Sequence, residues 1–150
     1  MEIILFEPEI PPNTGNIARL SAGLGIRLNL VEPLGFSIAD KDLKRAGLDY
    51  WPLVDLRVWP DWKSFRGAWR GGRIIATSAR RGEHFSGYAA EEGDGVLFGK
   101  ETAGLPEELT EAADRVYSIP LRPGVRSVNL STAVGFFMGI AMCRLQGGAA

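Results

Sequence analysis

Short apolar runs separated by helical spacings are the feature that most limits how this chain can fold. Continuous apolar runs are typical of strands buried on both faces of a parallel sheet. The expected strands are residues 3–6, 28–31, 54–59, 74–77, 96–98 and 116–121. The expected helices are a stretch opening at Asn13 or Thr14 as N-cap, 41–46, 62–69, a stretch with Pro106 at its first position, and 129–145. This alternation predicts an α/β fold with a mostly parallel sheet flanked by helices.

The last expected helix, 129–145, is apolar on nearly every face, which indicates burial all round. The chain has 150 residues, which suits a single domain spanning 1–150 that buries roughly 70% of its unfolded surface. In a domain of this size, we expect such a helix to pack against a second subunit as well as its own sheet.

Composition excludes several classes of protein. The chain holds one Cys and one His, so an intrachain disulfide is impossible and we expect no metal site. The start, MEIILFEPEI, lacks the basic region of a secretory signal. The most apolar stretch, 133–143, is far shorter than the roughly 20 residues that cross a bilayer. We therefore expect a cytoplasmic protein without membrane contact.

The charges are balanced in total but segregated along the chain. A net charge of −1 argues against a nucleic-acid partner. However, residues 61–82 hold six basic side chains and one acid, whereas residues 83–114 hold nine acids and one Lys. The basic stretch is either a solvated surface or a face that binds phosphate.

Two nucleotide-binding patterns fail on inspection. Gly23 and Gly25 follow a helix and precede a strand, which reverses the context of a dinucleotide fingerprint. Gly99 and Lys100 lack the Gly at position 94 and the Ser or Thr at 101 that a P-loop needs. The sequence therefore supports neither NAD nor ATP chemistry.

Three polar, glycine-containing loops remain, each after an expected strand, where an α/β sheet forms its ligand crevice. They are residues 13–19, 97–106 and 119–131. Arg19 and Arg126 suit phosphate or a developing oxyanion. A structural interpretation stays open for each loop, since Asn13 and Asn129 are good helix caps and the glycines suit turns.

At these loops the chain resembles the SPOUT superfamily of methyltransferases, and more closely the bacterial tRNA 2′-O-methyltransferases that act on wobble nucleotide C34 or U34. The segments that carry the resemblance are LFEPEIPPNTGNIARL, EPLGF, RAGLDY, LFGKETAGLP and IPLRPGVRSVNLSTA. The resemblance implies a C-terminal trefoil knot, an S-adenosylmethionine site within it, and assembly of that site at a homodimer interface.

Residue by residue, the resemblance implies roles for the matching positions. Those that would bind the cofactor are Thr77, Gly99, Glu101, Ile119, Leu121, Ser127 and Val128. Those that would serve catalysis are Asn13, Arg19, Glu101, Ser127 and Asn129. Arg19 would contact the target phosphate and 2′-oxygen, Asn13 and Glu101 would hold the active loop, and Ser127 and Asn129 would meet cofactor and ribose. The group that takes the proton stays open, because Arg19 is a poor base and His84 lies outside the motifs.

The chain is short for this superfamily, so the core itself is expected to bind the tRNA anticodon loop, through dimer loops and the basic stretch. The four tryptophans are candidates for stacking on bases, although core packing is their commoner role, and Tyr50 with Trp51 is a better exposed candidate than Trp69. Two alternatives are 2′-O-methylation at another tRNA or rRNA position, and a module that binds RNA or cofactor without catalysis.

Overall fold

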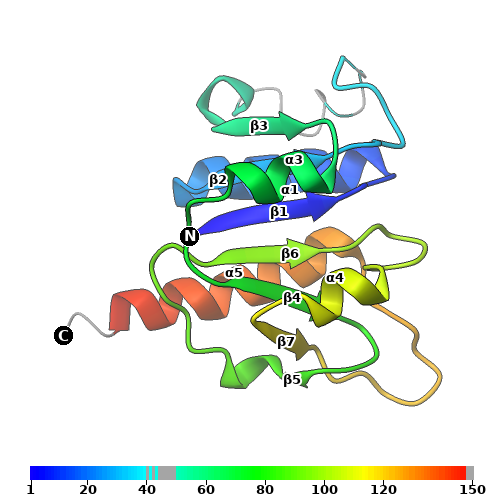
Figure 1. Ribbon diagram of the computed structural model, residues 1–150, viewed down its shortest axis with the longest axis vertical. Helices are drawn as coiled ribbons and strands as arrows, with labels where there is room; N and C mark the ends of the chain where they lie inside the picture. The colour runs from blue at the N-terminus through cyan, green and yellow to red at the C-terminus, as the bar shows by residue number, and fades with distance from the viewer. Residues whose placement is uncertain (40, 42, 44–49, 148–150) are drawn as a thin grey trace.

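The computed structural model describes residues 1–39, 41, 43 and 50–147, and its described strands form one seven-stranded sheet (Figure 1). The strands are β1 (Glu2–Phe6), β2 (Arg27–Val31), β3 (Leu56–Trp59), β4 (Ile74–Ser78), β5 (Glu83–His84), β6 (Gly95–Phe98) and β7 (Arg115–Ser118). Their order is β3-β2-β1-β6-β4-β7-β5, and every pairing among these strands is parallel. The expected α/β class is confirmed.

Helices cover both faces of the sheet. They are α1 (Pro11–Leu24), α3 (Trp62–Ala68), α4 (Glu107–Glu111) and α5 (Leu130–Gly147), with 3-10 turns η1 (Trp51–Leu53) and η2 (Phe85–Gly87). In Figure 1, α3 and α4 lie in front of the sheet and α1 and α5 lie behind it. The helix expected at 41–46 falls mostly outside the described residues.

The central strand β1 is buried on both faces, as its apolar run predicts. Ile3 and Leu5 belong to the core that includes residues of α1 and α5, whereas Ile4 and Phe6 belong to the core beneath α3 and α4. Successive side chains of a strand point to opposite faces, so β1 contributes to two cores at once.

Several element boundaries differ from the prediction. The expected N-cap at Asn13 or Thr14 is wrong: α1 begins at Pro11, because proline suits the first turn of a helix, where its missing N–H costs nothing. Gly25 ends α1 with a φ of 66°, as its position suggests. The last strand stops at Ser118 rather than at residue 121, and the two-residue β5 beside it carries no apolar signal.

The prediction that the last helix is buried all round is wrong for the single chain. Leu130, Val134, Phe137, Met138 and Ala141 are buried against the sheet and α1. The opposite side of α5 is exposed, and its exposed residues are Thr132, Gly135, Phe136, Gly139, Cys143 and Arg144. Among the helices that the structure describes, none has the length and hydropathy needed to cross a membrane.

Three of the four tryptophans are partly buried and pack against the core beneath α3 and α4 rather than standing as exposed stacking platforms. Trp59, Trp62 and Trp69 surround the buried Phe65, with ring centroids 5.7, 5.2 and 5.4 Å from it. Their indoles fix α3 to the sheet. Trp51 is half-buried against the other core.

An ion pair between the partly exposed Arg73 and the buried Asp94 ties the amino ends of β4 and β6 together. The carboxylate of Asp94 accepts hydrogen bonds from Arg73 (2.8 and 3.0 Å), from the Tyr88 hydroxyl (2.8 Å) and from the Glu91 backbone N–H (3.0 Å). Burial raises the pKa of Asp94, but these hydrogen bonds outweigh burial and the net pKa is lowered. The charged form is therefore the one that the fold stabilises.

We expect Asp94→Asn to reduce the free energy of unfolding at pH 7 by about 3 kcal/mol, because Arg73 loses its buried partner. A lowered native pKa means that the wild-type advantage is full above the unfolded pKa, near 4, and is lost progressively as the pH falls from there through the lower native pKa. Urea unfolding at pH 7 and pH 3 measures this difference. The exposed Glu92→Gln is the matched control, and an Asp94→Asn variant as stable as wild type at pH 7 would contradict the account.

Candidate functional site

The site lies where the strand order reverses. β1 and β6 are neighbours at the centre of the sheet, yet the chain continues from β1 to one side and reaches β6 from the other. At such a point the loops after the two strands diverge and leave a crevice at their carboxyl ends. Here these loops are residues 7–10 and 99–106.

The carboxylate of Glu101 joins the two loops. One of its oxygens accepts a hydrogen bond from the Glu9 backbone N–H at 2.8 Å. The other accepts from the Ile10 N–H at 3.2 Å and from the Asn13 side-chain amide at 3.1 Å. A single charged group thus fixes the start of α1 against the loop after β6.

The first turn of α1 explains why a distant carboxylate is needed. Its N-cap, Ile10, has no side chain that can cap, and Pro11 and Pro12 carry no N–H. A helix N-terminus is electropositive and is stabilised by a nearby anion. Glu101 supplies that anion from outside the helix.

Two further contacts lock the same loops. The Lys100 ammonium lies 2.7 Å from a Glu7 oxygen, and this hydrogen bond raises the pKa of Lys100. The backbone N–H and hydroxyl of Thr102 both donate to Glu9, at 3.0 and 2.8 Å, and lower the pKa of Glu9. The residue Glu7 adopts a positive φ of 48°, which is uncommon for a residue other than glycine and turns the chain sharply at the end of β1.

Asn129 extends this network to the last helix. Its amide donates to the Asn13 side-chain oxygen at 2.8 Å. Its own oxygen accepts from the Ser131 N–H at 2.9 Å and from the Thr132 N–H at 3.3 Å, so Asn129 also caps α5. For Asn129 the capping interpretation is thus correct, and the same side chain reaches the other loops.

Gly99 has a steric reason to be glycine. A Cβ at this position would lie 2.1 Å from the Gly104 carbonyl carbon and 2.2 Å from the Leu105 nitrogen. Only glycine therefore allows the 99–106 loop to fold back on itself, which keeps its backbone against the cavity.

The loops enclose a cavity of about 760 Å³ at the carboxyl edge of the sheet. Of the residues proposed from the sequence, those that line it are Asn13, Thr77, Gly99, Glu101, Ile119, Leu121, Ser127, Val128 and Asn129. The Thr77 hydroxyl donates to the Leu97 carbonyl at 3.0 Å, which holds the end of β4 to β6. The structure thus brings together nine residues from four separate segments.

Arg19 is not among them. It is exposed on α1, and its guanidinium carbon lies 4.7 Å from the ring centroid of Tyr50. His84, the other residue considered as a proton acceptor, also lies outside the cavity lining, and its Nδ1 accepts from the Ser86 N–H at 3.1 Å.

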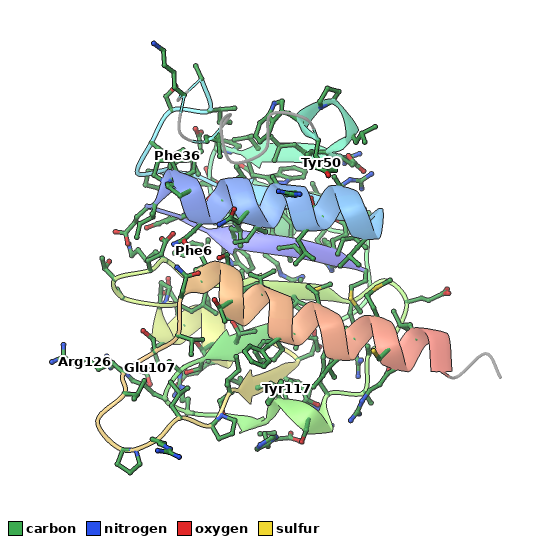
Figure 2. All side chains as sticks on the ribbon, turned by 180° about the vertical axis from the view of Figure 1, so that it is seen from behind. Phe6, Phe36, Tyr50, Glu107, Tyr117 and Arg126 are labelled. Carbon is green, nitrogen blue, oxygen red and sulfur yellow. The ribbon has the colours of Figure 1, made fainter. Side chains whose placement is uncertain are left out.

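The cavity has a basic rim that the sequence motifs do not identify as part of the site. Arg80 and Arg81 from the loop after β4 line it together with Arg126 from the loop before α5. Arg81 pairs with Glu107 at 3.2 Å. Within the part of the chain that the structure describes, neither Arg80 nor Arg126 has a carboxylate within 4 Å. Figure 2 labels Glu107 and Arg126 at this end of the sheet.

The basic stretch 61–82 is therefore divided by the fold. Lys63 and Arg66 are exposed on α3, and Arg70 follows that helix. Arg73 is occupied by Asp94 and Glu91. Only Arg80 and Arg81 reach the cavity, and their place immediately after strand β4 is the signal that could have identified them.

The geometry suits a ligand of nucleoside size whose neighbour carries phosphate. A volume of several hundred Å³ is typical of cofactor sites. Apolar walls such as Leu121 and Phe137 can cover a flat ring, and the rim arginines can bind phosphate oxygens.

Comparison with known proteins places this arrangement in a family. The model of the SpoU rRNA methylase family matches residues 1–139. The tRNA (cytidine(34)-2′-O)-methyltransferase of Methylovorus glucosotrophus is 45% identical over 139 residues, which cover 91% of this chain and 90% of that protein.

Solved structures of methyltransferases have the same fold as this chain. A structure described as giving insights into the 2-OH methylation of C/U34 on tRNA has a TM-score of 0.93 and 46% identity, and the match covers 97% of this chain and 96% of that one. The AdoMet-bound rRNA methyltransferase of Sinorhizobium meliloti, at 23% identity, has the same fold, with a TM-score of 0.86 over 96% of this chain and 56% of that one. These matches confirm the resemblance of the three loops, and the chain belongs to the SpoU rRNA methylase family of methyltransferases.

Proposed function

We propose that this protein transfers a methyl group from S-adenosylmethionine to the ribose 2′-hydroxyl of the tRNA wobble nucleotide, C34 or U34. The observation that carries the proposal is the likeness to a tRNA (cytidine(34)-2′-O)-methyltransferase at 45% identity over 91% of the chain. We place this reaction in the cavity at the carboxyl edge of the sheet. Because the substrate is tRNA, we expect the protein to act in the cytoplasm.

The cavity residues fit the cofactor. Residues from three different segments line the cavity and offer both main-chain polar groups and apolar side chains. They are Thr77, Gly99, Ile119, Leu121 and Val128. A nucleoside with a short charged tail needs this mixture. We infer that Ser127 and Glu101, which also line the cavity, complete the cofactor site, and that the chain around it forms the trefoil knot implied by the SPOUT resemblance.

When bound, the cofactor supplies a methyl group on a sulfonium, which is activated without a metal ion. The protein's task is then to hold the 2′-hydroxyl in line with that methyl, and positioning of this kind contributes about 7–11 kcal/mol in favourable cases. Asn129 and Ser127 are placed to meet the ribose, and Asn13 with Glu101 keeps the loops in register. Arg19 carries a permanent charge, so its role is to bind the target phosphate and stabilise the developing 2′-oxyanion.

We propose that RNA binds at the basic rim of the cavity. Arg80 and Arg126 offer guanidinium donors that the described acids leave free, and these suit consecutive phosphates of a single-stranded loop. Net charge near zero is therefore compatible with tRNA binding, because Arg80, Arg81 and Arg126 gather on the rim of the cavity.

We also propose a homodimer that packs through α1 and α5. In Figure 2 the two helices lie side by side on one face of the sheet, where η1 contacts α1 and Phe85 of η2 contacts Phe136 and Phe137 of α5. The outer side of α5 presents the small and apolar residues Gly135, Phe136 and Gly139. A second copy would cover this side and would bring Arg19, which is exposed and does not line its own cavity, toward the partner subunit.

The function is tested with purified protein, S-adenosylmethionine and synthetic anticodon stem-loops, followed by mass mapping of the methylated nucleotide. We expect methylation of stem-loops with C34 or U34 and none of a stem-loop that carries 2′-deoxyribose at position 34. The family description names rRNA, so rRNA fragments are included as an alternative substrate. Methylation of rRNA or of another tRNA position, with position 34 untouched, would overturn the proposal.

Glu101→Gln should lower the rate of methyl transfer about 10- to 100-fold, because an amide cannot accept from the Glu9, Ile10 and Asn13 donors together. Glu108→Gln, an exposed acid on α4, is the matched control and should keep full activity. Single-turnover rates measure the effect, and equal rates for the two variants would show that the Glu101 network is dispensable.

Gly139→Glu tests the dimer face. Gly139 is exposed on α5 and nothing lies within 4 Å of an added Cβ, so the single chain tolerates the change while a partner surface would not. Sedimentation should give twice 16.3 kDa for wild type and 16.3 kDa for the variant. Gly67→Glu on α3 is the control and should stay dimeric. A monomeric wild type, or a dimeric Gly139→Glu variant, would contradict the proposed face.

A further inference from the structure

We infer that Tyr50 is a positioning residue for Arg19: its ring holds the guanidinium in a fixed orientation while leaving the guanidinium's hydrogen-bond donors available for RNA. The inference rests on the proposed role of Arg19 in binding the target. It assigns a role to Tyr50, which does not line the cavity.

The contact joins two distant parts of the sequence. The Arg19 guanidinium carbon lies 4.7 Å from the Tyr50 ring centroid, within the range of a cation–π interaction. Arg19 comes from the exposed side of α1, and Tyr50 comes from the turn that precedes β3. Figure 2 shows Tyr50 beside α1, on the side of the helix away from the label of Arg126.

The turn that carries Tyr50 is anchored independently of Arg19. The Tyr50 carbonyl accepts from the Leu53 N–H at 2.8 Å, and the following Trp51 packs, half-buried, against the core that α1 also covers. The core therefore holds in place the backbone that carries the Tyr50 ring. A fixed partner is what an exposed arginine, with its many rotamers, otherwise lacks.

An aromatic partner suits a binding arginine better than a carboxylate does. A carboxylate would neutralise the charge and occupy donors on the edge of the guanidinium. A ring contacts the flat face instead, so the edge donors stay free for the oxygens of a phosphate or of the 2′-oxyanion. The position of Arg19 outside its own cavity makes such orientation more important, since no cavity wall confines the side chain.

The test is a double-mutant cycle on methylation of the anticodon stem-loop, with Tyr50→Ala, Arg19→Ala and the double variant. We expect Tyr50→Ala to lower kcat/KM for RNA about 3- to 10-fold, and Arg19→Ala about 10- to 100-fold. In the Arg19→Ala background, Tyr50→Ala should have no further effect. The Kd for S-adenosylmethionine should not change in any variant.

Two controls separate positioning from folding. Tyr50→Phe keeps the ring and should restore activity to within about 2-fold of wild type, and Leu53→Ala, which removes an exposed side chain from the same turn, should leave it unchanged. Thermal unfolding monitored by circular dichroism checks that each variant is folded.

Independent effects of the two substitutions, a Tyr50→Phe variant as weak as Tyr50→Ala, or a Tyr50→Ala variant as active as wild type would each overturn the inference. If wild type leaves position 34 unmethylated, the proposed target is wrong, and the cycle is measured as the Kd for tRNA. The same coupling between Arg19 and Tyr50 is expected there, and additive effects on that Kd would overturn the inference separately.

Discussion

The Glu101 carboxylate is the interaction on which the rest of the site depends. It accepts hydrogen bonds from the loop after β1 and from the first turn of α1, and it stands in the loop after β6. The two proline residues at the start of α1 remove the helix's own donors there and leave its positive end to be met by a distant anion. Asn13 and Asn129 then carry this connection to α5. Three segments of the chain are thereby held around one cavity.

Much of this organisation could be predicted from the sequence because it depends on local patterns. The buried strands β1, β2, β4 and β6 follow from continuous apolar runs, and the polar loops after them follow from the alternation of strands and helices. The places where prediction failed are those that tertiary contacts decide. Strand β5 exists because Glu83 and His84 lie beside Tyr117 and Ser118, and its two residues show no pattern of their own.

In the site, too, local patterns predict some features and tertiary contacts decide the others. Nine of the residues proposed from the motifs line the cavity, since each motif follows a strand whose carboxyl end lies at this edge of the sheet. The motifs do not include Arg80 and Arg81, which reach the cavity because they directly follow strand β4, whereas Lys63 and Arg66 lie on α3 and do not reach it. The sequence could not show that Arg19 lies outside the cavity lining and contacts Tyr50. It also could not show that one side of α5, which carries Gly135, Phe136 and Gly139, is exposed in the single chain.

The most direct measurement is a crystal structure of the protein soaked with S-adenosylhomocysteine, the product that the proposed reaction leaves behind. The account predicts that the nucleoside lies in the cavity among Thr77, Gly99, Leu121 and Ser127, with the Glu101 carboxylate still bound to the Glu9 and Ile10 N–H groups. Binding at another surface, or a bound state in which Glu101 has left α1, would contradict it.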